Sequence, residues 1–130
     1  MQQLISNRRF LRTMRITFAA ACVFAVVMAL LPQPPYIPTQ NFGDKVQHII
    51  GFATLAALAA LAFPGAPRWQ VIERLSFLGA WIEVAQSIPA LGRDCDILDW
   101  VADTVAVIVV TAIAALVVPR PERGGLRFPS

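Results

Sequence analysis

The residues best suited to chemistry are concentrated between Trp81 and Asp103, in a chain that is otherwise very apolar. A charged group at the centre of a membrane helix costs roughly 2.5–3.5 kcal/mol on insertion scales. Such groups therefore persist where they pair with one another, face a bundle interior or line a wet cavity. The stretch predicts a functional site. Its polar residues are Glu83, Gln86, Arg93, Asp94, Asp96, Asp99 and Asp103.

His48 is the single histidine of the chain. Beside carboxylates, an imidazole can titrate near neutral pH and act as a general acid or base. The catalytic candidates are His48, Glu83, Asp99 and Asp103, with no single residue assigned. One histidine with several carboxylates could also hold a divalent cation, but no His-x-x-x-His pair or spaced Cys/His set supports zinc. No metal or cofactor is assigned from the sequence.

The composition is typical of an integral membrane protein. Of 130 residues, 57% are hydrophobic and 15% are charged, against roughly 25% charged in soluble domains. The length suits one domain, residues 1–130. The basic residues lie in flanks and form no basic face, which excludes a nucleic-acid-binding protein. Cys22 and Cys95 fall in different environments, so no disulfide is expected.

Four apolar runs predict an all-α, four-helix membrane bundle, with spans at 14–31, 46–63, 71–88 and 97–118. Prolines separate the runs, because proline fixes φ and ends helices. The basic region before the first run also fits a signal peptide. Three further apolar runs favour a membrane span instead.

The basic residues predict the orientation. With four spans, both termini and the 64–74 turn lie on one side of the membrane, and nine of the eleven basic residues are there. They are Arg8, Arg9, Arg12, Arg15, Arg68, Arg74, Arg120, Arg123 and Arg127. Lys45 and Arg93 lie on the other side. The positive-inside rule then places both termini in the cytoplasm, in a multi-pass protein of the inner (plasma) membrane.

Helical spacing gathers polar side chains at the extracytoplasmic face, where the second span begins, the third ends and the fourth begins. On the third span one small and polar stripe contains Ser76, Gly79, Ala80, Glu83, Gln86 and Ser87. Asp96, Asp99, Asp103 and Ala106 share a face of the fourth span, and Asp44, His48 and Phe52 share one on the second.

The predicted ligand-binding residues are Lys45, His48, Glu83, Gln86, Arg93, Asp94, Asp99 and Asp103. Asp44 and Asp96 are expected to cap the helices that follow them. Trp81 and Trp100 are expected to face lipid or the membrane interface. A structural network of ion pairs and hydrogen bonds remains an alternative for the whole set.

These residues resemble the motifs of the VanZ-like membrane proteins. The motifs are Asp44-Lys45-Val46-x-His48, Phe52, Glu83-x-x-Gln86, Pro89, Gly92-Arg93-Asp94 and Asp96-Ile97-Leu98-Asp99, within residues 43–118. The family consists of small proteins with about four spans, and its namesake is linked to reduced susceptibility to teicoplanin. This chain departs from the pattern after Asp99: Asp103, Ala106 and Val110 stand where the family usually has Asn and glycines.

The resemblance implies a cell-envelope membrane protein that affects glycopeptide susceptibility. In this hypothesis Arg93 and Lys45 bind an anionic lipid or cell-wall group at the outer leaflet. One alternative is an enzyme that acts on a lipid-linked substrate with His48 and a carboxylate. Another is a structural or accessory protein. Membrane lipids are the expected partners, and four short spans make a bundle thin enough for a homodimer, which the sequence does not specify.

Overall fold

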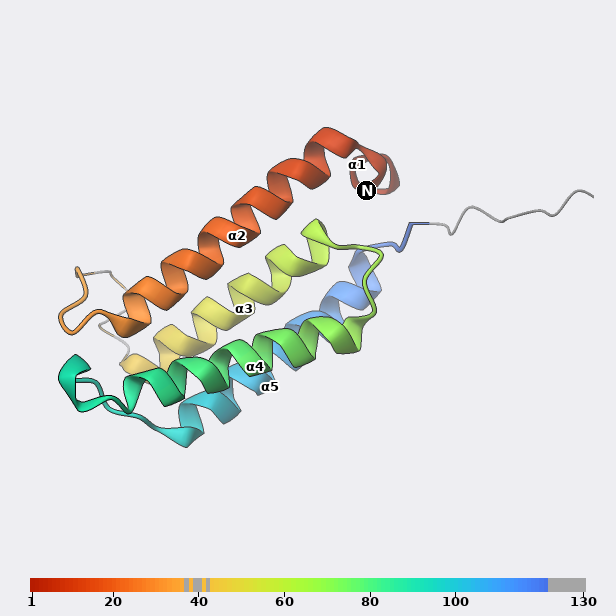
Figure 1. Ribbon diagram of the computed structural model, residues 1–130. Helices are drawn as coiled ribbons and strands as arrows, with labels where there is room; N and C mark the ends of the chain where they lie inside the picture. The colour runs from red at the N-terminus through yellow and green to blue at the C-terminus, as the bar shows by residue number, and fades with distance from the viewer. Residues whose placement is uncertain (37, 39–40, 42, 122–130) are drawn as a thin grey trace, which may run out of the picture.

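The computed structural model describes residues 1–36, 38, 41 and 43–121, and every regular element in these ranges is a helix. Four long helices lie side by side and run alternately up and down (Figure 1). The elements are α1 (Gln2–Ser6), α2 (Arg8–Leu30), α3 (Asp44–Ala62), α4 (Arg68–Gln86), the 3₁₀ helix η2 (Pro89–Leu91) and α5 (Ile97–Val117). Arg123 and Arg127, which the sequence predicts on the cytoplasmic side, fall outside the described residues.

Three of the long helices, α2, α3 and α5, are long and apolar enough to cross a membrane. The chain is therefore a membrane protein by the length and composition of its helices. The fourth long helix, α4, matches α3 in length at 19 residues but is less apolar. It contains Arg68, Glu73, Arg74 and Glu83.

Local signals explain where the helices begin and end. Asn7 caps α2 by accepting hydrogen bonds from the backbone N–H groups of Arg9 and Phe10, so this helix starts before the predicted residue 14. Asp96 caps α5 in the same way. Asp44 is instead the first residue of α3, and Gly43 occupies the cap position with a φ of 88°, a conformation that favours glycine. The predicted capping role of Asp44 is therefore wrong, although its charge still suits a helix N-terminus.

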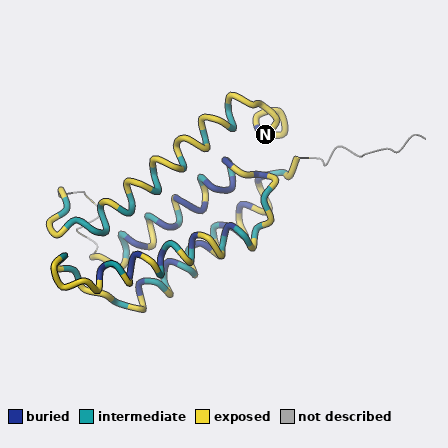
Figure 2. The backbone as a smooth tube through the Cα atoms, in the orientation of Figure 1, coloured by how far each residue is buried: buried dark blue, intermediate teal, exposed yellow. Residues whose placement is uncertain are grey.

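The core is centred on α3, which contacts α2, α4 and α5. Figure 2 shows buried residues recurring along α3, whereas α2 is exposed or half-buried along its length. Small residues let the helices approach one another closely. A Cβ atom added at Gly79 would lie 3.3 Å from Trp100 and 3.4 Å from Phe52. The core cluster contains Phe52, Leu55, Ala56, Ala59, Val71, Leu75, Ile82 and Val107.

The short helix α1 lies at the start of α2, at the same end of the bundle as the end of α5 (Figure 1). Ile5 is buried there in a cluster with Ala60, Ala114 and Val118. Two arginines satisfy carbonyl groups at helix C-termini, which lack intrahelical partners. Arg15 Nε donates to the carbonyl of Ala62 at 3.2 Å, and Arg68 donates to that of Val118 at 3.3 Å. These contacts join α2 to α3 and α4 to α5 at the basic end of the molecule.

Candidate functional site

The opposite end of the bundle brings together the polar residues that the sequence predicted to converge. The start of α3, the end of α4, the following loop and the start of α5 each contribute to this group. We call it the polar cluster. It consists of Asp44, Lys45, His48, Glu83, Arg93, Asp96, Asp99 and Asp103.

His48 and Asp103 form the most buried pair of the cluster. The distance from His48 Nδ1 to Asp103 Oδ2 is 3.0 Å, and the two side chains are 8% and 1% exposed. A carboxylate behind an imidazole fixes the ring orientation and its tautomer. The other ring nitrogen, Nε2, has no hydrogen-bond partner in the part of the chain that the structure describes. The pair therefore holds a histidine with one nitrogen available for a ligand.

Lys45 connects α3 to the start of α5. Its ammonium forms ion pairs with Asp99 and, at 3.3 Å, with Asp96. Asp96 Oδ1 accepts a hydrogen bond from the backbone N–H of Leu98 at 2.9 Å. This hydrogen bond, and secondarily the contact with Lys45, holds the pKa of Asp96 below its ordinary value. Lys45 is thus paired to carboxylates of its own chain.

Glu83 and Gln86 anchor other segments to α4. Glu83 Oε2 accepts a hydrogen bond from the backbone N–H of Asp96 at 2.9 Å. Gln86 Nε2 donates to the carbonyl of Ala29, near the end of α2, at 2.9 Å. The structure therefore uses two predicted ligand-binding residues to fix the loop before α5 and the end of α2.

Arg93 and Asp94 are neighbours with different surroundings. Arg93 lies 3.4 Å from Asp44 Oδ1 and lines the adjacent pocket. This distance is long for a charge-assisted hydrogen bond, which is typically about 2.7–2.9 Å. Asp94 is exposed and has no ion pair or hydrogen bond to the cluster in the described ranges. Arg93 therefore belongs to the site, whereas the geometry gives Asp94 no contact with it.

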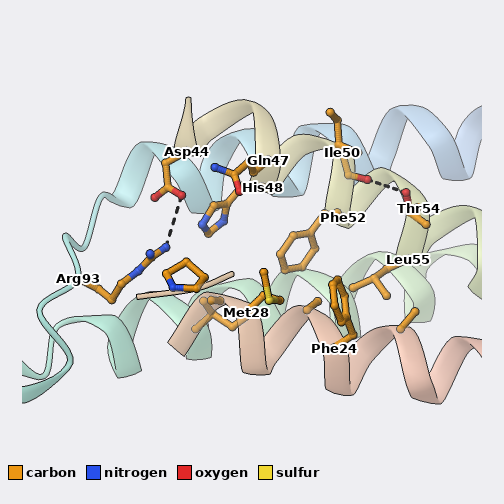
Figure 3. A pocket seen from close by; sticks show the side chains of 16 residues that line it. Phe24, Met28, Asp44, Gln47, His48, Ile50, Phe52, Thr54, Leu55 and Arg93 are labelled. Atoms are coloured by element: carbon orange, nitrogen blue, oxygen red, sulfur yellow. Dashed lines mark hydrogen bonds and ion pairs between the residues drawn. The ribbon is translucent and has the colours of Figure 1, made fainter. Parts of the chain in front are cut away.

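A pocket of about 330 Å³ opens beside the polar cluster, between α2 and α3 (Figure 3). Its wall is mostly apolar, with Phe24 and Met28 from α2 facing Phe52 and Leu55 from α3. Its polar end is formed by Asp44, Gln47, His48 and Arg93. A cavity with an apolar wall and a few convergent polar groups is the usual form of a small-ligand site. Here it suits a molecule with a hydrocarbon portion and a polar head.

Several pocket residues were not predicted from the sequence. Phe24 and Met28 lie in an uninterrupted apolar helix, where nothing distinguishes them from lipid-facing residues. Gly51 lines the pocket one turn after His48. This spacing places it on the same face of the helix as His48, and it could have been predicted on that ground. Trp100 also differs from its prediction, because its indole N–H donates to the carbonyl of Ser76 at 3.0 Å, between α4 and α5.

Comparisons of the chain with protein-family models, with curated proteins and with solved structures find no match. The site itself therefore carries the functional argument. Its elements are an apolar pocket, an arginine at the mouth and a histidine oriented by a buried carboxylate. This arrangement can bind an amphiphile, ligate a cation through the histidine, or exchange a proton with a bound head group.

Proposed function

We propose that the protein binds an anionic amphiphile, such as a lipid or a lipid-linked cell-wall precursor, at the extracytoplasmic face of the inner membrane. The pocket is the observation that carries this proposal: it joins an apolar wall to Arg93 and His48 at its polar end. Within the described ranges, Arg93 has one polar contact, the long one of 3.4 Å to Asp44. Its remaining N–H donors suit a phosphate or carboxylate.

A four-span topology supports the placement of the pocket. Although α4 is less apolar than the other long helices, it packs against α3 and α5 and runs alongside them (Figure 1). A helix held in that position crosses the bilayer with its neighbours. The charges Arg68, Glu73 and Arg74 then lie near the basic end, where the positive-inside rule puts the cytoplasm. The pocket opens at the opposite end, toward the outer leaflet.

Filling the pocket tests the proposal. Outside its own stretch of helix, no described atom lies within 4 Å of a Cβ atom built at Gly51, so a leucine side chain there begins in open space beside the pocket. We expect phosphatidylglycerol to raise the melting temperature of the detergent-solubilised wild type more than phosphatidylcholine does. A ligand at a hundred times its Kd stabilises a protein by about 2.7 kcal/mol. Gly51→Leu is expected to lose this stabilisation.

Ala57→Leu is the matched control, because Ala57 is exposed on the same helix and does not line the pocket. This variant should keep the full shift with phosphatidylglycerol. Equal shifts for Gly51→Leu and Ala57→Leu would contradict the proposal, since the lipid would then act on the outer surface of the bundle.

The resemblance to VanZ-like proteins extends the proposal to glycopeptide susceptibility. Expression of the wild type in a teicoplanin-sensitive bacterium is expected to raise the inhibitory concentration of teicoplanin several-fold. Gly51→Leu should abolish the effect at equal expression, because the pocket is where the lipid-linked precursor binds. An unchanged inhibitory concentration for the wild type would remove this part of the proposal and leave lipid binding to be judged by the melting experiment.

An enzyme is the second candidate, favoured by the contact between Asp103 and His48 Nδ1. In that case Nε2 acts as the general base toward the bound head group. Mass spectrometry of the lipid recovered after incubation separates the two candidates. A lipid of unchanged mass supports binding alone, and a released head group supports the enzyme.

A further inference from the structure

Three residues of the polar cluster, Asp44, His48 and Asp99, bring atoms that can ligate a metal ion close together. One donor atom each from Asp44, His48 and Asp99 lies within 4.8 Å of the other two. Metal–ligand distances are about 2.0–2.6 Å for nitrogen and oxygen donors, so two ligands of one ion lie at most about 5 Å apart. Asp44 and His48 are one turn apart on α3, and Asp99 lies in the first turn of α5. The three donors thus come from two helices that the core already fixes against each other.

The charge balance of the cluster favours a cation. Asp44, Glu83, Asp96, Asp99 and Asp103 provide five carboxylates, against the two cationic side chains of Lys45 and Arg93. Both cations already contact carboxylates of the chain. Asp99 and Asp103 are buried, where uncompensated negative charge is costly. A bound divalent cation compensates it and also supplies the positive charge that an anionic head group needs.

Two polar atoms without partners, on side chains that are more than nine-tenths buried, point to a ligand at this place. The His48 side chain is 8% exposed and lines the pocket, yet its Nε2 has no hydrogen-bond partner among the described residues. Asp103 is 1% exposed, and its Oδ1 is buried without a hydrogen bond while its Oδ2 contacts His48. Histidines that bind metals usually donate their other ring N–H to a carboxylate. Asp103 stands in that position.

We propose that Asp44, Asp99 and the Nε2 atom of His48 bind one divalent metal ion, with Asp103 orienting the histidine. Three protein ligands leave coordination positions open, as in sites where a metal binds a substrate. The pocket lies beside Asp44 and His48, so an open position faces it. If the proposed function is correct, a phosphate or carboxylate oxygen of the amphiphile occupies that position. This last step rests on the proposed function, and the metal site itself does not.

Mn²⁺ is the probe for this site. The full-length protein in detergent, stripped with a chelator, is expected to bind one Mn²⁺ per chain by calorimetry. Electron spin-echo spectra of the bound Mn²⁺ should contain the nitrogen couplings of one imidazole. His48→Gln should remove these couplings, and Asp44→Asn and Asp99→Asn should each weaken binding at least about tenfold. Asp44 is 51% exposed, so Asp44→Asn tests the site without threatening the fold.

Two further variants distinguish a metal site from a merely acidic surface. Lys45→Gln removes the ammonium that is paired with Asp99, and is expected to tighten Mn²⁺ binding about tenfold. Asp94→Asn removes an exposed acid outside the cluster and should leave the affinity unchanged. Absence of Mn²⁺ binding, absence of nitrogen couplings, or equal effects of Asp94→Asn and Asp44→Asn would each overturn the metal site.

Gly51→Leu separates the failure of this inference from that of the proposed function. The variant fills the pocket but changes none of the three ligands, so Mn²⁺ binding should persist while stabilisation by phosphatidylglycerol is lost. Mn²⁺ binding with no lipid effect in the wild type would contradict the proposed function and support the metal site. A lipid effect without Mn²⁺ binding would support the proposed function and contradict the metal site.

Discussion

Replacing Asp103 with alanine is expected to lower the free energy of unfolding by about 3 kcal/mol. Asp103 is 1% exposed and its Oδ2 lies 3.0 Å from His48 Nδ1, deep between α3 and α5. Alanine leaves the buried imidazole without its partner at Nδ1. Removing one member of a buried pair costs more than the pair contributes, because the remaining polar group stays buried and unsatisfied.

Thermal and denaturant unfolding in detergent measure this effect. Asp103→Asn is the informative partner variant, because its amide oxygen still accepts a hydrogen bond from Nδ1–H, and a loss of about 1 kcal/mol is expected. Asp94→Ala, an exposed acid before α5, should change stability by less than about 0.5 kcal/mol. If Asp103→Ala were no more destabilising than Asp94→Ala, the contact between His48 and Asp103 would not hold α3 and α5 together.

The helices could be predicted from the sequence because their signals are local. Long apolar runs and the prolines between them set the number and the approximate bounds of the four long helices. The errors lie at the ends, where capping decides. Asn7 begins α2 in a stretch without hydrophobic periodicity, and Gly43 takes the position predicted for Asp44. Such details depend on single backbone conformations, which composition does not reveal.

The convergence of polar groups could also be predicted, because an up-and-down chain brings alternate loops to the same end. The pairing of these polar groups with one another could not be predicted. Nothing in the spacing indicates that Lys45 pairs with Asp99, or that His48 pairs with Asp103. These choices depend on helix rotation and rotamers in the packed bundle. The backbone groups bound by Glu83 and Gln86 were equally hidden, because every residue carries the same N–H and C=O.

The pocket was missed for a related reason. It exists because α2 contributes no fully buried residue and rests on α3 through half-buried side chains. An apolar helix that lines a cavity and one that faces lipid have the same composition. The sequence therefore predicted which end of the bundle gathers the polar residues, whereas the shape of the pocket depends on how loosely one helix packs against the others.

The alanine-rich face of α3 packs closely against the neighbouring helices. Because a larger side chain would disturb this contact, Ala56→Leu is expected to destabilise the protein by about 2 kcal/mol or more. Ala56 is 0% exposed within the core cluster, where α3 meets its neighbours. Membrane helices associate through close contact of small side chains, because lipid provides no hydrophobic force between them. Leucine at this position adds three carbons where no space exists, so the neighbouring helices must separate or the side chain must take a strained rotamer.

Ala57→Leu provides the matched comparison, since it makes the same chemical change one residue further along the helix, at an exposed position. Its effect should stay within about 0.5 kcal/mol. Unfolding in detergent measures the difference, and crosslinking between cysteines introduced on α3 and α5 reports whether the helices separate. The two helices hold the metal ligands Asp44, His48 and Asp99 in register, so Ala56→Leu should also weaken Mn²⁺ binding, whereas Ala57→Leu should not. Equal stability of the two variants would mean that α3 is rotated relative to the arrangement in Figure 2, with a different face toward its neighbours.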